Sequence, residues 1–229
     1  MKNIVILSGA GMSAESGIST FRDAGGLWEG HDIMEVASPE GWRKNPELVT
    51  EFYNKRRLQL AEVEPNAGHL ALKLLEAENQ VTIITQNVDD LHERAGSNTI
   101  VHLHGELTKM RSSEYENDIY EVGYEAISYG TLCSKGTLLR PHIVWFGEAV
   151  PMIDKAIDMI SNAQVLIIVG TSLEVYPAAG LMHYAPTDCL IYLIDPNRHQ
   201  NLNNSRIELI KDTAANALPK LVTELISKS

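Results

Sequence analysis

Six short apolar runs, rich in valine and isoleucine, recur along the chain between polar stretches. They are NIVIL at 3–7, VTIIT at 81–85, TIVHL at 99–103, HIVWF at 142–146, QVLIIVG at 164–170 and CLIYLI at 189–194. Runs that are apolar at nearly every position suit strands buried on both faces, as in a parallel sheet covered by helices, better than the half-polar strands of a sandwich.

Stretches with the periodicity of helices lie between these runs, at 45–63, 66–79, 152–162 and 213–227. In the second of them, Asn66 is a candidate N-cap, and Leu70, Leu74 and Leu75 are expected to form the buried stripe. Strands that alternate with helices predict an α/β fold with a doubly wound, mostly parallel Rossmann-like sheet.

Two segments depart from this alternation. Residues 31–77 contain helical patterns with no strand between them, and residues 105–140 are polar, with scattered tyrosines. We expect these two insertions to form a smaller lobe over one edge of the sheet. The Rossmann-like domain then comprises residues 1–30, 78–104 and 141–229.

Composition restricts the setting of the protein. The chain has 229 residues and a net charge of -11, which argues against nucleic acid as a partner because binding phosphates requires a basic face. The two cysteines, Cys133 and Cys189, form no C-x-x-C pair, so neither a disulfide framework nor a thiolate zinc site is indicated. The first apolar run is too short to cross a membrane or to act as a signal sequence, so we expect a cytoplasmic protein with no membrane contact.

His102 and His104 stand two residues apart at the end of one apolar run. Alternate residues of a strand share a face, so both imidazoles would reach one metal ion or one substrate. A metal site would need further ligands, for which the other histidines show no spacing. From the residues alone, a catalytic base and a metal site both stay open.

Polar segments follow two of the predicted strands. Residues 8–17, SGAGMSAESG, contain G-x-G-x-x-A, which lets the backbone approach a pyrophosphate at the start of a helix, although an ordinary glycine-rich turn has the same pattern. Gln86, Asn87 and Asp89 follow the strand at 81–85, at the edge where open α/β sheets bind ligands. Capping of the next helix would explain one of these three side chains.

Five motifs, in this order, resemble the sirtuin family of NAD-dependent protein lysine deacylases: GAGMSAESGISTFRDAGGLW, TQNVDD, HGEL, RPHIVWFGE and GTSLEVYPAAG. The resemblance runs from Ile4 to about Pro196. It implies an enzyme that consumes NAD and acts on acylated lysine side chains of proteins. Free lysine, nicotinamide and O-acyl-ADP-ribose would be its products, and we expect a monomer.

The resemblance also implies roles for individual residues. His104 would be the catalytic base, which suits an imidazole with an ordinary pKa of about 6.5, and Asn87 would take part in catalysis. His102 would have no catalytic part and would be a packed or hydrogen-bonded residue. The cofactor-binding positions would be Gly9, Ala10, Gly11, Ser13, Ala14, Phe21, Arg22, Asp23, Trp28, Gln86, Asn87, Asp89, Gly170, Thr171, Ser172, Asp195 and Ala214.

The substrate-binding positions come from two further segments and one helix. The family holds the acyl-lysine peptide as an added β-strand, which implies contacts from Val144, Trp145, Phe146, Gly147, Glu148, Glu174, Val175 and Tyr176. Tyr53 and Arg56 have the i, i+3 spacing of one helix face and match the Tyr-x-x-Arg of the desuccinylase-type (class III) bacterial branch. A phenol and a guanidinium can bind the terminal carboxylate of succinyl- or malonyl-lysine, although a solvated basic helix face would have the same pattern.

The sequence departs from the family in the insertion after the His-Gly motif. Most sirtuins carry four cysteines there, which bind a structural zinc, whereas residues 105–140 contain only Cys133. A closed zinc site needs four ligands, so we predict no metal. We expect the lobe to be held by packing of Tyr115, Ile119, Tyr120, Tyr124, Tyr129 and Leu132. Leu193 is a second departure, since it stands where the family usually has an Asn, two residues before Asp195.

Other hypotheses stay open beside a deacylase that removes succinyl, malonyl and acetyl groups. One is a deacetylase that acts on acetyl-lysine alone. Another is a non-catalytic NAD(H)-binding sensor, which would not need His104. An oxidoreductase with the same dinucleotide turn would produce NADH, whose absorbance distinguishes it from a deacylase.

Overall fold

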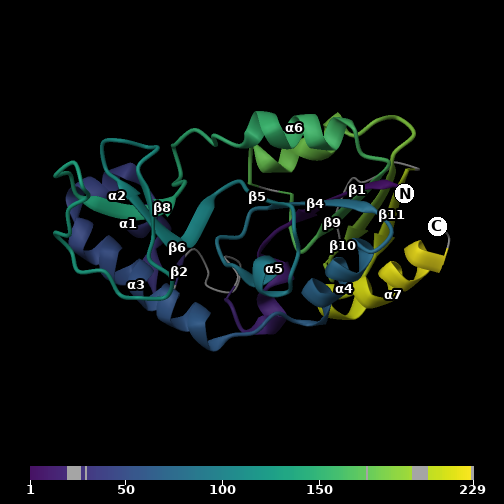
Figure 1. The fold of residues 1–229 in the computed structure, drawn as a ribbon, viewed down its shortest axis with the longest axis horizontal. Coiled ribbons are helices and arrows are strands. Elements are labelled where there is room, and N and C mark those ends of the chain that lie inside the picture. Colours follow the sequence, from purple (N-terminus) through teal and green to yellow (C-terminus); the bar gives the residue numbers. More distant parts are fainter. Residues whose placement is uncertain (20–26, 29, 174, 198–205, 228–229) are drawn as a thin grey trace.

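Six parallel strands form the central sheet, in the order β11-β10-β9-β1-β4-β5 (Figure 1). They are β1 (Asn3–Ser8), β4 (Gln80–Thr85), β5 (Ile100–His102), β9 (Val165–Val169), β10 (Leu190–Ile194) and β11 (Ile207–Ile210). This is the strand order of a doubly wound Rossmann-like sheet, so the predicted fold class is confirmed. The computed structural model describes residues 1–19, 27–28, 30–173, 175–197 and 206–227.

Helices cover both faces of this sheet. α4 (Ala67–Leu75) and α7 (Ala214–Ser227) lie side by side on one face, as Figure 1 shows, and α6 (Ile153–Ser161) and the 3-10 helix η3 (Ala178–Tyr184) lie on the other. Because each face packs against its own helical layer, side chains on both faces of the inner strands are buried. This explains the unbroken apolar runs of the sequence.

The N-terminus of α4 forms as predicted, because the side chain of Asn66 accepts a hydrogen bond from the backbone of the first turn at 2.9 Å. The predicted apolar stripe is wrong at Leu70 and Leu74, which are 52% and 61% exposed, whereas Leu75 is buried as predicted. The residues that face the sheet are Ala71, Leu72 and Leu75. Residues 70–75 are nearly all apolar, so the sequence allows either of two faces of this helix to be the buried one.

A smaller lobe lies beside the sheet, at the left of Figure 1. Its helical part contains α1 (Ile33–Val36), α2 (Pro39–Lys44) and α3 (Pro46–Glu62), after the short strands β2 (Leu27–Trp28) and β3 (His31–Asp32). Its second part is an antiparallel sheet in the order β7-β6-β8, with β6 (Gly105–Ser112), β7 (Ile119–Glu121) and β8 (Leu139–Ile143). α3 packs against β6 and β8, so the two insertions form one body.

Two predicted features of this lobe are wrong. The boundary at residue 77 is too late, because α4 buries its apolar face on the main sheet beside α7. The run HIVWF at 142–146 is not a parallel strand, because its first residues end β8 of the antiparallel sheet. A short apolar run shows that a strand is buried but does not show which sheet it joins.

Polar side chains of α3 join the two insertions. The fully buried guanidinium of Arg57 donates from Nε to Glu125 O at 3.1 Å and from Nη1 to Leu107 O at 3.4 Å. Asn54 donates from Nδ2 to Ile127 O at 2.9 Å and accepts from Ile127 N at 3.0 Å. Buried carbonyl groups, which cannot bind water, accept hydrogen bonds from these side chains instead. The same bonds connect the insertion at 105–140 to α3.

The predicted aromatic packing of the lobe is mostly wrong. Four of its six side chains are at least 45% exposed, namely Tyr115, Ile119, Tyr129 and Leu132. Tyr124 packs against the core of the lobe, and its hydroxyl donates to Asp90. Hydrogen bonds join Cys133 Sγ to Thr137 Oγ1 at 3.0 Å and Ser112 Oγ to Thr137 Oγ1 at 2.6 Å. Polar contacts therefore organise the region where packing was expected.

Candidate active site

The glycine-rich turn after β1 packs directly against the turn after β9. Gly9 N donates to Val169 O at 3.0 Å, and Gly11 N donates to Gly170 O at 2.8 Å. A Cβ on Gly9 would lie 2.8 Å from Gly170 O, and Gly170 has a left-handed φ of 63°. The glycines are thus required by the close contact of two turns at the point where the strand order of the sheet reverses.

The α-helix expected after this turn does not form. Two single-turn 3-10 helices, η1 (Ala10–Met12) and η2 (Ala14–Ser16), take its place. Gly17, with φ 99°, ends η2 after one turn. The predicted helix N-terminus is therefore wrong, and the turn offers a short curved backbone to the site.

The segment after β4, residues 86–89, is held from behind by the end of β5 and the chain that follows it. Its carbonyl oxygens accept three successive hydrogen bonds: Gln86 O from His104 Nδ1 at 3.0 Å, Asn87 O from His102 Nδ1 at 3.1 Å, and Val88 O from Leu107 N at 2.7 Å. Because a carbonyl oxygen only accepts, Nδ1 of each imidazole carries the hydrogen. The two histidines of the H-x-H pattern therefore bind neighbouring peptide groups.

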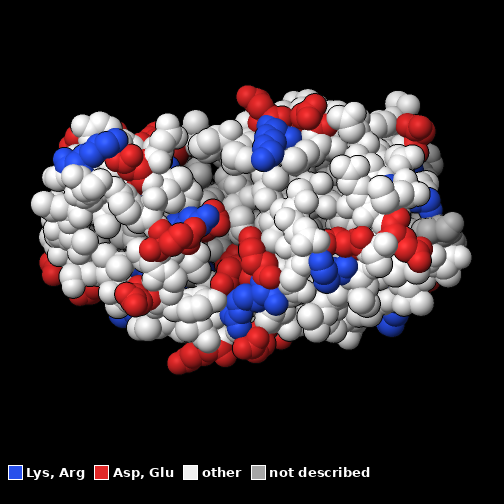
Figure 2. All heavy atoms as spheres, in the orientation of Figure 1, with Lys and Arg blue, Asp and Glu red and all other residues white. Residues whose placement is uncertain are grey.

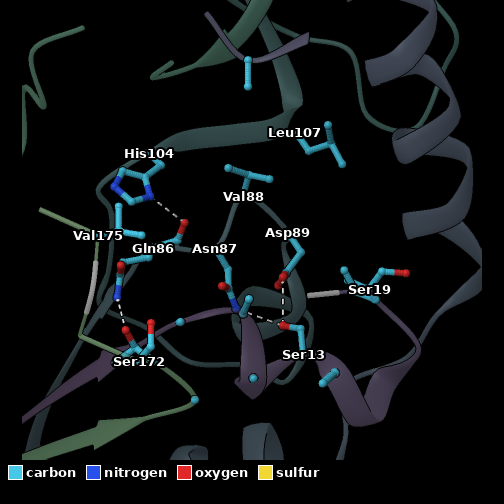
Figure 3. Close-up of a pocket in the computed structure, with 18 of the residues that line it drawn as sticks. Ser13, Ser19, Gln86, Asn87, Val88, Asp89, His104, Leu107, Ser172 and Val175 are labelled. Carbon is cyan, nitrogen blue, oxygen red and sulfur yellow. Dashed lines mark hydrogen bonds between the residues drawn. The ribbon is translucent and has the colours of Figure 1, made fainter. Parts of the chain in front are cut away.

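A chain of hydrogen bonds links the ends of β1 and β4 (Figure 3). Asn87 Nδ2 donates to Ser13 Oγ at 3.1 Å, and Ser13 Oγ donates to Asp89 Oδ2 at 2.8 Å. Burial raises the pKa of Asp89, while the hydrogen bonds from Ser13 and from Leu91 N oppose that rise. The result is a fixed set of amide and carboxylate groups, which is suited to a ribose or a carboxamide.

His104 lines the cavity, and its ring points one nitrogen at the Gln86 carbonyl group (Figure 3). With Nδ1 donating, the neutral ring keeps its lone pair on Nε2. Burial lowers the pKa of His104 below its ordinary value, and the hydrogen bond to Gln86 opposes this only in part. At neutral pH this side chain is a base that can accept a proton at Nε2.

His102 does not line the cavity, and both of its ring nitrogens are engaged. Nδ1 faces Asn87 O at 3.1 Å, and Nε2 faces Glu93 Oε1 at 2.8 Å. Neither nitrogen offers a lone pair to a metal. In the part of the chain that the structure describes, no three or more His, Cys, Asp or Glu side chains gather as metal ligands. His102 is the hydrogen-bonded residue that was expected.

Two side chains of α3 line the end of the cavity nearest the small lobe. Tyr53 is fully buried and Arg56 is 7% exposed, one helical turn apart. Trp145 Nε1 donates to the Tyr53 hydroxyl at 3.1 Å. Burial raises the pKa of Tyr53 well above its ordinary value, so the phenol stays neutral.

Trp145 is itself fixed by an ion pair. Its backbone N donates to Glu148 Oε2 at 2.8 Å, and the Arg140 guanidinium lies 3.4 Å from the centre of the indole ring. Arg140 also donates to both carboxylate oxygens of Glu148, at 2.7 and 3.1 Å. Burial by itself raises the pKa of Glu148, but the hydrogen bonds from Arg140 and Trp145 lower it below its ordinary value.

The backbone donors of residues 144–146 are used within the chain. Val144 N donates to His104 O at 2.9 Å, Phe146 N to Ala37 O at 3.0 Å, and Trp145 N to Glu148, as described above. A peptide strand could therefore pair here with carbonyl oxygens, but not with these three N–H groups.

The opposite end of the cavity lies at β10 and α7. Asp195 is 4% exposed, lines the cavity and accepts a hydrogen bond from Asn197 N at 2.7 Å. Leu193 is buried in the core between the sheet and α6, so it makes no contact with the cavity. Glu15 accepts from Thr213 Oγ1 and Ala215 N at 3.0 and 2.8 Å and thereby closes this end.

One cavity of about 760 Å³ connects the glycine turns, the segment after β4, His104, the two side chains of α3 and Asp195. The predicted site residues that line it are Gly9, Ala10, Gly11, Ser13, Ala14, Tyr53, Arg56, Gln86, Asn87, Asp89, His104, Val144, Trp145, Phe146, Gly147, Glu148, Gly170, Thr171, Ser172, Val175, Tyr176, Asp195 and Ala214. Phe21, Arg22, Asp23 and Glu174 lie outside the described residues, as does the side chain of Trp28.

Several lining residues were missed from the sequence. Gln59 lies three residues after Arg56 on α3, and Glu15 lies within the glycine-rich segment, so helical spacing and proximity to the motif would have indicated them. Leu107 and Ile143 come from the antiparallel sheet of the lobe. Nothing in the sequence shows which face of that sheet meets the cavity.

Known proteins share this sequence and this arrangement. Residues 9–177 match the model of the Sir2 family. An NAD-dependent protein deacylase of Helicobacter pylori is 57% identical over 99% of this chain and 98% of its own length. An NAD-dependent protein deacylase of Bacteroides thetaiotaomicron is 53% identical over 99% of both chains.

Solved structures match the fold closely. A Sir2 homologue in complex with ADP-ribose has a TM-score of 0.89 at 38% identity, covering 98% of this chain and 92% of its own. A Sir2 homolog–NAD complex has a TM-score of 0.87 at 38% identity, covering 98% and 90%. A Sir2 protein bound to a propionylated peptide has a TM-score of 0.79 at 26% identity, covering 98% and 92%.

Proposed function

The chain belongs to the Sir2 family and is an NAD-dependent protein deacylase, and we propose that it removes succinyl and malonyl as well as acetyl groups from lysine. The observation that carries the proposal is the placement of Tyr53 and Arg56. Both line the same cavity as His104, so a cationic donor and a phenol face the space that an acyl chain would enter. We infer that they bind the terminal carboxylate of the acyl group.

Charge and burial favour this role. Arg56 is 7% exposed, and a buried guanidinium gains more from a bidentate carboxylate than an exposed one does. Trp145 is a donor only, so the Tyr53 hydroxyl accepts from it and directs its own hydrogen elsewhere. An acetyl group would present a methyl group to both side chains and offer them no carboxylate to bind.

The cofactor NAD fits the groups that line the rest of the cavity. The Asn87 amide and the Asp89 carboxylate are already oriented by Ser13, and the glycine turns of β1 and β9 expose backbone beside them. We assign Asn87 and Asp89 to the nicotinamide ribose and the carboxamide, and Asp195 to the adenosine ribose. NAD, when bound, supplies an electrophilic ribose carbon and a ribose hydroxyl that can act as a nucleophile. His104 accepts a proton at Nε2 from that hydroxyl.

We further propose that the lobe needs no zinc. The chain has only two cysteines, and Cys189 is buried in the core beside the main sheet, apart from Cys133 in the small lobe. The bonds of Arg57 and Asn54 to backbone groups of the insertion supply a connection that does not depend on metal.

The partner is a protein segment that carries an acyl-lysine. Phe146, Val175 and Tyr176 are 42%, 42% and 73% exposed at the mouth of the cavity, which supports contacts with an extended peptide. We propose a monomer as the working unit. On the face drawn in Figure 2, basic side chains lie in small groups beside acidic ones, in keeping with a partner other than nucleic acid. No helix in the described ranges has the length and apolarity of a membrane span.

The decisive experiment compares acetyl- and succinyl-lysine peptides of one sequence, with NAD and EDTA present. Nicotinamide and O-acyl-ADP-ribose are followed by mass spectrometry, with His104→Ala as the control for background. Succinyl removal that survives chelation and is lost in the variant supports the proposal. Acetyl removal alone would leave an acetyl-specific deacetylase, and binding of NAD without any product would indicate a sensor.

A further inference from the structure

We propose that His102 is a positioning residue of the NAD site, which acts as an imidazolium held by Glu93 and fixes the Asn87 backbone from behind the cavity. This inference rests on the assignment of Asn87 and Asp89 to NAD. The His102 side chain is 9% exposed and does not line the cavity, so it acts through Asn87 and not by contact with a ligand.

Hydrogen-bond geometry defines the charge of His102. Nδ1 lies 3.1 Å from Asn87 O, and Nε2 lies 2.8 Å from Glu93 Oε1. Carbonyl and carboxylate oxygens only accept, so each ring nitrogen must carry a hydrogen, and imidazole has both only when it is protonated. A neutral ring would satisfy one of the two oxygens and leave its other nitrogen facing an acceptor.

The cation acts on a connected set of groups. Asn87 accepts from His102 at its carbonyl and donates from Nδ2 to Ser13 Oγ, which in turn donates to Asp89. Rotation of the Asn87 peptide would therefore move the side-chain amide and weaken its bond to Ser13, the group that also binds Asp89. His104 would keep its place, because it is bonded to the preceding carbonyl group. Loss of His102 should thus weaken NAD binding more than it slows the chemical step.

Charged and titratable groups face His102 from three elements. Glu93 and His92 belong to α5 (Leu91–Arg94), Glu106 belongs to β6, and Asp89 lies between β4 and α5. Burial by itself lowers the pKa of His102, but Glu93 and Glu106 raise it above its ordinary value. The cation also opposes the rise in the pKa of Asp89. The two acceptor contacts require the cation, the raised pKa extends it to higher pH than in an ordinary imidazole, and it is lost as the pH rises past that pKa.

The test measures KM for NAD with an acetyl-lysine peptide between about pH 6 and pH 9. In the wild-type enzyme KM should rise at the alkaline end. Glu93→Gln should move that rise to lower pH, because His102 loses the partner that holds its proton. His102→Leu should raise KM for NAD about tenfold at neutral pH and abolish the dependence of KM on pH. It should change kcat by less than about threefold.

Glu106→Gln is the matched control, since it removes a negative charge near His102 without removing a hydrogen bond to it, and it should shift the profile less than Glu93→Gln. The Glu93 side chain is 40% exposed, so its replacement keeps the test decisive even if His102→Leu does not fold. An NMR titration should place the pKa of His102 above about 6.5. Identical KM profiles for wild type and Glu93→Gln, or titration below that value, overturn the role of His102. Absent wild-type turnover would instead refute the deacylase function.

Discussion

Trp145 Nε1 lies 3.1 Å from the hydroxyl oxygen of Tyr53 and donates a hydrogen bond to it, which joins the segment after β8 to α3. Because an indole is only a donor, the phenol hydrogen points away from Trp145. Trp145 cannot easily turn away, since Arg140 stacks on its ring and Glu148 binds its backbone. The contact therefore holds the phenol oxygen in place in the lining of a cavity that a guanidinium also lines.

Removing the phenol oxygen should change acyl preference more than activity. In Tyr53→Phe we expect kcat/KM for a succinyl-lysine peptide to fall at least about tenfold, the effect of one hydrogen bond to a charged group. The value for the acetyl peptide should fall by less than about threefold, because acetyl offers no carboxylate. Steady-state kinetics on matched peptides measure both. Equal losses on the two peptides would mean that Tyr53 shapes the cavity and does not read the carboxylate.

Removal of succinyl groups should depend on a guanidinium at position 56, and not only on a positive charge there. Lysine keeps the charge but cannot form two parallel hydrogen bonds to a carboxylate, so Arg56→Lys should lower succinyl turnover strongly while a positive charge remains. Lys55→Arg is the matched control, since Lys55 is exposed on the same helix. A variant with Lys at position 56 that kept full succinyl activity would show that charge alone is sufficient.

The acidic limit of activity should report His104. The base works when neutral, and burial lowers the pKa of His104 below its ordinary value. Activity should therefore persist as the pH falls through about 6.5 and be lost only below it, when Nε2 is protonated. The measurement is kcat/KM for an acetyl peptide against pH, with protein integrity checked at each point. An acidic limb at or above that value would contradict the neutral, buried base.

Much of the site was accessible from the sequence because it lies at strand ends. Parallel strands end at one edge of the sheet, so Gly9, Asn87 and Gly170 had to meet once the strands were identified. Similar reasoning gave Tyr53 and Arg56 as one helix face. Their arrival at the same cavity depended on the resemblance to a known family, because helix spacing says nothing about what the face meets.

The rest depended on tertiary contacts that no local pattern encodes. The tyrosines of residues 105–140 do not show how that insertion is held, because Arg57 and Asn54 bind its backbone. Every residue has a backbone carbonyl group, so the sequence of the insertion does not reveal these contacts. The role of His102 is a similar case. Its partner Glu93 comes from another element, and only the folded chain shows that both ring nitrogens face acceptors.

The buried Arg57 should be important for stability. Arg57→Met removes the bonds to Glu125 O and Leu107 O and leaves buried carbonyl groups without donors, so the free energy of unfolding should fall by about 3 kcal/mol. Lys55→Met on the exposed face of the same helix should change it by less than about 0.5 kcal/mol. Chemical denaturation with and without EDTA measures both effects. Loss of stability in EDTA for the wild-type protein would contradict the zinc-free lobe.

Stability should also decrease in mild acid because two histidines are buried side by side. The rings of His69 and His92 lie 4.8 Å apart, and Asn66 N donates to His69 Nδ1 at 3.3 Å, which fixes His69 in its neutral form. Burial lowers the pKa of His69 to about 4, and it also lowers that of His92. The folded state therefore resists protonation, whereas the unfolded chain takes up protons below about pH 6.5.

The full stability contribution of neutral His69 is present above the unfolded pKa, and it is lost as the pH falls from about 6.5 toward the folded value near 4, by about 3 kcal/mol in all. Urea unfolding at several pH values measures the slope. His69→Gln should be less stable than wild type at neutral pH but should lose less on acidification, since glutamine does not titrate. His183→Gln controls for the loss of a histidine at an exposed position. If His69→Gln kept the wild-type slope, the acid sensitivity would have to come from His92 or from the carboxylates.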